Sequence, residues 1–146
     1  MKRLGLGALL VLAGCSSFDR DWEAWRGERS ASTAADWSGC WEGIWHSDVN
    51  GHQGSLRCII TSGNSGSEAR YYATYTWWLF PLTFEYTVPL EVVREGEAWK
   101  SRGSAELGCW VAGGLYEYEG RAAGDDYVAT YRSDFDRGVF RLKRVK

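Results

Sequence analysis

From residue 39 onward, apolar and polar residues alternate in short runs that are separated by turn residues. Alternation with a period of two is typical of strands that bury one face. This part of the chain has no sustained helical period. The pattern predicts strands at 39–47, 54–61, 69–78, 80–88, 90–95, 97–106, 114–122, 126–132 and 138–145.

The turns between these runs have recognisable chemistry. Asn50-Gly51 supplies the positive φ of a tight hairpin, and Glu95-Gly96 and Gly124-Asp125 are turn sequences of the same kind. Consecutive hairpins make a meander, and a twisted sheet of about eight strands closes because closure removes exposed edges. We therefore expect an all-β domain over 39–146: a single antiparallel up-and-down meander of about eight to nine strands, closed into a small barrel or folded as a sandwich.

The segment 15–38 is predicted to be a tether. Ser, Ala, Thr and charged residues dominate it, and such a composition buries too little apolar area to fold by itself. Within it, Phe18, Trp22 and Trp25 are spaced by four and three residues, which indicates a short amphipathic helix. Such a helix would dock on the barrel or lie at a membrane interface.

The first residues have the features of an export signal. Positive Met1-Lys2-Arg3 precedes an uncharged apolar run that is too short to span a bilayer, which needs ~20 residues. The run ends in Leu12-Ala13-Gly14-Cys15, which resembles the lipobox of bacterial lipoprotein precursors. The resemblance implies removal of residues 1–14 and attachment of fatty chains, such as palmitate, to Cys15. Two or three chains anchor a protein stably in a membrane.

Two other interpretations of this segment stay open: an ordinary secretory signal in which Cys15 has no role, and an uncleaved helix packed on the domain. Ser16 follows the cysteine, where an acidic residue would favour inner-membrane retention. The lipobox resemblance therefore implies a cell-envelope protein, in the outer membrane if the host has one.

Export would place the remaining cysteines in an oxidising compartment, where one disulfide is expected. Cys40 and Cys109 both occur in a Gly-Cys-Trp tripeptide and are the favoured pair. Cys58 alternates with Leu56 and Ile60, which predicts a buried thiol that packs as a small apolar residue.

Gly43-Ile44-Trp45, followed by a hairpin and a meander, resembles the opening of calycin-type barrels such as lipocalins and avidins. In those barrels the Trp of a Gly-x-Trp strand closes one end. The resemblance implies a barrel with Trp45 in that place. It implies no ligand, because no ligand-contacting pattern of those families is present.

Aromatic residues make up 15% of the chain, and many of them fall between residues 71 and 86. One face of these strands fills the core, and the other must meet the tether helix, a protein partner, a membrane interface or a small apolar ligand, unless its rings are simply scattered over the surface. The candidate ligand or partner surface is Trp41, Trp45, Tyr75, Trp77, Trp78 and Phe80. A net charge of −2 argues against nucleic-acid binding.

Two clusters suggest catalysis. His46, Asp48 and His52 surround the first hairpin, and Glu117 and Glu119 share a strand face about 7 Å apart. Exposed turn and strand residues are the favoured explanation of both clusters, and no metal or cofactor is predicted. The favoured function is a lipid-anchored, non-catalytic binding or structural module of the cell envelope; the alternative is an envelope hydrolase that uses one of these clusters.

Overall fold

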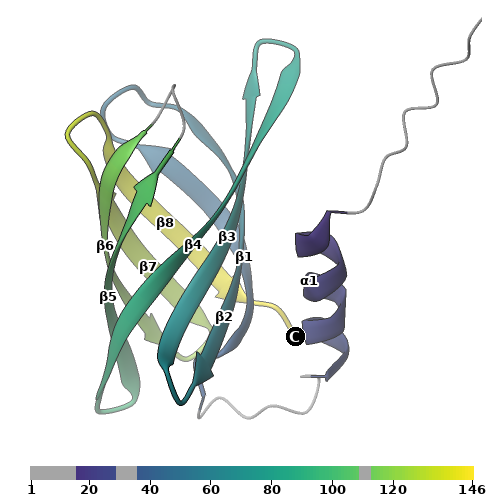
Figure 1. The fold of residues 1–146 in the computed structure, drawn as a ribbon, viewed down its shortest axis with the longest axis vertical. Helices are drawn as coiled ribbons and strands as arrows, with labels where there is room; N and C mark the ends of the chain where they lie inside the picture. Colours follow the sequence, from purple (N-terminus) through teal and green to yellow (C-terminus); the bar gives the residue numbers. More distant parts are fainter. Residues whose placement is uncertain (1–15, 29–35, 109–112) are drawn as a thin grey trace, which may run out of the picture.

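The computed structural model describes residues 16–28, 36–108 and 113–146. In these ranges the chain forms helix α1 (Ser17–Glu28) and eight strands that close into a barrel (Figure 1). Each strand pairs antiparallel with the next, and β8 pairs with β1. The predicted all-β meander and barrel are therefore confirmed, and the sandwich is not formed. The strands are β1 (Gly39–Ser47), β2 (Gln53–Gly63), β3 (Gly66–Trp77), β4 (Phe80–Glu95), β5 (Ala98–Leu107), β6 (Gly114–Ala123), β7 (Asp126–Arg132) and β8 (Arg137–Arg144).

Strand β4 replaces the two strands predicted at 80–88 and 90–95, so the break expected at Pro89 is wrong. Proline cannot donate a ladder hydrogen bond and is confined to strand positions with a free side. β4 pairs with β3 up to Leu90 but with β5 only from Leu90 to Glu95. Pro89 and Pro81 both lie in the part that pairs with β3 alone, where a missing donor is tolerated.

Aromatic side chains fill the middle of the barrel. The Tyr71 ring lies 5.4 Å from the Tyr86 ring and 5.2 Å from the Phe140 ring, measured between centroids. The hydroxyl oxygens of Tyr71 and Tyr127 are 3.1 Å apart and share a hydrogen bond. Both tyrosines are almost fully buried. The interior at this level is therefore packed rather than hollow.

One end of the barrel, where β1 begins and β8 ends, is closed by Trp41; we call it the capped end. Trp41 is fully buried, and the Arg144 guanidinium carbon lies 4.4 Å from the centroid of its ring. Arg144 also donates to the backbone oxygens of Asp36 and Ser38, at 3.0 and 3.1 Å.

Trp41 of Gly39-Cys40-Trp41, and not Trp45, covers the capped end, and closure of an end by Trp45 stays a prediction. Both side chains lie on the inward face of β1, four residues apart, so alternation alone does not distinguish them. Trp45 lies toward the other end, where its Nε1 donates to the backbone oxygen of Thr74 at 3.1 Å.

Helix α1 docks on the outer face of β1, β2 and β3, which confirms the predicted short helix (Figure 1). Buried Phe18 and Trp22 pack against Ile59 and the Cys40 side chain. The Arg57 guanidinium lies 5.2 Å from the Phe18 ring centroid and donates to the Asp19 carboxylate at 2.8 Å. This bond lowers the pKa of Asp19. The apolar helix face and its charged border thus hold α1 in place together.

The three cysteine predictions have different outcomes. Cys58 is fully buried in the core, as expected of a small apolar residue. Cys40 is buried beneath α1, with its Sγ 3.8 Å from the Trp22 backbone oxygen. Cys109, Cys15 and the signal segment lie outside the described residues, so the Cys40–Cys109 disulfide and the lipid on Cys15 stay predictions.

Barrel closure makes Gly43 intolerant of a side chain. A Cβ at this position would lie 1.9 Å from the Arg141 backbone oxygen in β8. We expect Gly43→Ala to lower the free energy of unfolding by about 1–3 kcal/mol, measured by urea denaturation. The matched control is Gly27→Ala in α1, where a Cβ meets nothing within 4 Å; this variant should be neutral or up to about 1 kcal/mol more stable. Equal stability of the two variants would contradict the described contact of β1 with β8.

The packed tyrosines make the barrel sensitive to alkali. Burial raises the pKa of Tyr71 and Tyr86 well above their usual value and that of Tyr127 to about 12. Because the folded pKa values are raised, the protonated tyrosines contribute their full stability to the fold below pH ~10. This contribution is lost as the pH rises through the folded pKa values. Tyrosinate absorbance and circular dichroism should change together as the core tyrosines ionise. Tyr127→Phe should make the alkaline loss of stability shallower; ionisation of these tyrosines without unfolding would contradict the packed interior.

Candidate functional site

The hairpin formed by β3 and β4 projects beyond the rest of the barrel (Figure 1). Trp78 and Leu79 form its turn, and Trp77 pairs with Phe80 across it. The exposed fractions are 63% for Trp77, 85% for Trp78, 81% for Leu79 and 64% for Phe80. We call these four residues the aromatic tip.

The tip continues the face of β3 and β4 that lines the barrel interior. Cross-strand pairs on this face run from the core outward, and the opposite face carries threonines. The pairs are Tyr71 with Tyr86, Ala73 with Phe84, Tyr75 with Leu82 and Trp77 with Phe80. The inner pair lies in the core, and the outer pair has passed beyond the neighbouring strands. The same alternation that builds the core therefore exposes apolar side chains at the tip.

Trp78 adopts a backbone conformation that tryptophan rarely takes. Its φ is 61°, in the left-handed region that hairpin turns usually fill with Asn or Gly. A bulky residue there costs on the order of 1–2 kcal/mol. Since the ring is mostly exposed, the fold does not recover this cost by burying it. The turn therefore holds an exposed tryptophan at a backbone cost that its own packing does not offset.

Apolar side chains are also exposed on other connections at this end of the barrel, which we call the hairpin end. Val49 lies in the β1–β2 turn, Leu115 at the start of β6, and Phe135 between β7 and β8. The connections at the capped end are polar: 63–66, 95–97 and 124–125. The exposed apolar groups at the hairpin end, Val49, Leu115, Phe135 and the aromatic tip, are together called the hairpin-end surface.

The structure brings together five of the six residues predicted as a ligand or partner surface. Trp45 and Tyr75 lie at the base of the hairpin with ring centroids 5.9 Å apart, and Trp77, Trp78 and Phe80 form the tip. The prediction for Trp41 is corrected, because this residue faces inward at the capped end and is fully buried.

Two further contributors were missed by the sequence analysis. The His52 ring stacks on Tyr75 at 4.9 Å between centroids, and Leu79 is as exposed as the tryptophans beside it. A signal for the tip is present in the sequence: no charged residue occurs from 71 to 84. His52 had no such signal, because its stacking depends on how the β1–β2 turn meets β3.

The first catalytic cluster does not converge on one point. His46 Nδ1 lies 3.5 Å from Asp48 Oδ1, whereas His52 stacks on Tyr75 at the base of the hairpin. Among the described residues, no group of three or more His, Cys, Asp or Glu side chains is placed to hold a metal ion.

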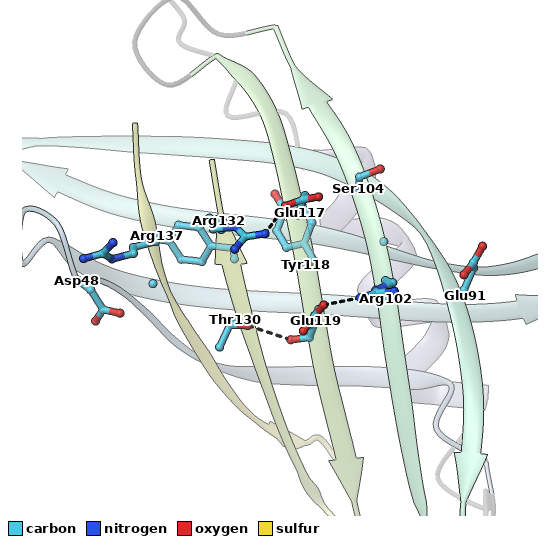
Figure 2. Close-up of a pocket in the computed structure, with 13 residues that line it drawn as sticks. Asp48, Glu91, Arg102, Ser104, Glu117, Tyr118, Glu119, Thr130, Arg132 and Arg137 are labelled. Atoms are coloured by element: carbon cyan, nitrogen blue, oxygen red, sulfur yellow. Dashed lines mark hydrogen bonds and ion pairs between the residues drawn. The ribbon is translucent and has the colours of Figure 1, made fainter. Parts of the chain in front are cut away.

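Glu117 and Glu119 lie on the outer face of β6, where they line an open hollow of about 690 Å³ (Figure 2). Arg132 donates to Glu117 at 2.7 Å and Arg102 to Glu119 at 3.0 Å. The Arg132 bond lowers the pKa of Glu117. A glycosidase-type pair needs one carboxyl that stays protonated, which is the opposite arrangement. The bond from Arg132 therefore disfavours Glu117 as the proton donor of such a pair.

No family model, no curated protein and no solved structure matches the chain. No helix in the described ranges is both long enough and apolar enough to cross a membrane. The hairpin-end surface is thus the strongest candidate site that the described residues offer.

Because of its backbone conformation, replacing Trp78 should stabilise the protein, whereas replacing a core residue would destabilise it. Trp78→Gly should raise the free energy of unfolding by about 0.5–1 kcal/mol, because glycine adopts positive φ without strain. Urea denaturation measures the change. The control is Trp77→Gly inside β3, which should destabilise the protein. A less stable Trp78→Gly variant would show instead that the indole ring supports the fold.

Proposed function

We propose that this protein is a lipid-anchored, non-catalytic binding module of the cell envelope that makes its contacts through the hairpin-end surface. Fatty chains on Cys15 attach it to the membrane, the outer one if the host has two. The observation that carries the proposal is the difference between the two barrel ends. Exposed apolar side chains gather at the hairpin end, while the loops at the capped end are polar.

The energetics of the aromatic tip support a binding role. Burying a large apolar side chain that would otherwise be exposed contributes about 1.5–3 kcal/mol. Trp77, Trp78, Leu79 and Phe80 leave this contribution unused in the isolated protein. Contiguous exposed apolar surface of this kind marks interaction sites on soluble domains. The packed barrel interior directs the contact to the end of the barrel rather than to a central cavity.

The direction of α1 supports the anchor. Figure 1 shows the first residues of the docked helix turned toward the end from which the hairpin projects. Cys15 lies two residues before α1, so its Cα is within about 8 Å of the Cα of Ser17. Fatty chains on Cys15 would thus start beside the barrel wall near Arg70, at the end of the helix that points toward the hairpin end.

The proposal predicts which positions contact a partner in cells. A photo-crosslinking amino acid at position 78 should give adducts, whereas the same residue at Asn64, in a polar loop of the capped end, should not. Metabolic labelling with a fatty acid should mark the wild-type protein and leave Cys15→Ser unmarked. Adducts from both positions or from neither would contradict the binding role, and labelled Cys15→Ser protein would contradict the anchor.

A further inference from the structure

We infer that the hairpin-end surface docks on the lipid bilayer, with the aromatic tip inserted at the boundary between the headgroups and the acyl chains. This inference rests on the proposed function and names the occupant of the same surface. Four features of the structure favour a bilayer: the chemistry of the tip, the position of the flanking charges, the backbone at the turn, and the shape of the surface.

The chemistry of the tip suits a membrane interface. Tryptophan is enriched at the headgroup level because its ring is apolar while its N–H seeks a polar partner. Here Trp78 and Leu79 form the turn, and Trp77 and Phe80 pair beside it. The uncharged run from 71 to 84 means that no charged side chain of the hairpin must lose its hydration when the tip enters the interface.

The nearest charges along the hairpin lie well below the tip and are paired. Arg70 Nε donates to Glu85 across the strands at 2.8 Å, and the Arg70 guanidinium also bonds Asp21 and Ser17 of α1. Glu85 is the nearer of the two to the tip: five steps along β4, about 17 Å of strand at 3.3 Å per residue, separate it from Phe80. These paired charges therefore stay in water when only the tip is inserted.

The backbone at the tip limits insertion to a shallow depth. Unpaired peptide groups are costly in hydrocarbon, and over residues 80–89 β4 pairs with β3 alone. The unpaired edge of β4 must therefore remain hydrated, apart from the first residues after the turn. Pro81 lacks an N–H and lies one residue past Phe80, so it removes one donor where the strand meets the interface.

The shape of the hairpin-end surface favours a broad, deformable partner over a fitted protein. Its side chains lie on separate connections, with Val49 and Phe135 on loops other than the hairpin. The tip projects, whereas the hollows of the molecule lie on the outer face of β4–β8 among charged residues such as Arg102 and Glu119. A bilayer needs no pocket on the protein and can receive a tip that projects.

The test uses tryptophan fluorescence of the mature protein in vesicles of phosphatidylethanolamine and phosphatidylglycerol that contain phosphatidylcholine with brominated acyl chains. Bromine quenches only fluorophores that reach the bilayer. Because two of the nine tryptophans lie at the tip, we expect partial quenching of the wild type. Most of this quenching should be lost in Trp77→Phe/Trp78→Phe, which keeps the tip apolar but removes both indoles. The matched control is Trp99→Phe, near the start of β5 at the capped end, which should keep the wild-type quenching.

Quenching that is unchanged in Trp77→Phe/Trp78→Phe, or absent in the wild type, overturns the bilayer inference. The crosslinking experiment then separates the two proposals. Protein adducts from position 78 without bromine quenching mean that the surface binds a protein, so the proposed function survives and the bilayer inference fails. Absence of both adducts and quenching means that both fail. If the isolated chain carries no fatty acid, the same vesicles are added to it and the same quenching comparison applies.

Discussion

The pairing of β1 with β8 closes the sheet, and the packing of the interior depends on this closure. Strand side chains alternate between two faces, so closure directs every second residue into one shared space. Tyr71, Tyr127 and Phe140 come from strands far apart in the chain and meet only because the sheet is a ring. The approach of Gly43 to the Arg141 backbone belongs to the same closure and leaves no room for a side chain.

Closure also explains why the hairpin is exposed. β3 and β4 continue past the strands beside them, so their inward face loses its neighbours while its alternation continues. Tyr71 and Trp77 therefore share one face of β3 but have opposite environments, one fully buried and the other mostly exposed. Strand length, rather than a change in the residue pattern, leaves side chains of the core-forming face exposed at the tip.

The two ends of the barrel differ because charge and apolar surface are separated along its axis. At the capped end Arg144 covers Trp41 and bonds the backbone of the segment before β1. On the flank, Arg57 and Arg70 hold α1 through carboxylates and aromatic rings. Their charges are satisfied within the fold, which leaves the hairpin end as the apolar part of the surface.

The sequence by itself determined the meander, the strands at 39–47 and 126–132 to the residue, and the buried Cys58, because turn chemistry and alternation are local properties. It also placed Trp77, Trp78 and Phe80 among the candidate surface residues, since two aromatic faces cannot both enter one core. Only the tertiary structure decided that Trp41 caps the barrel, that Pro89 lies within one continuous strand, and that His52 stacks on Tyr75. Each of these depends on which strand lies alongside and where it ends, and neighbours distant in the chain leave no mark on a local pattern.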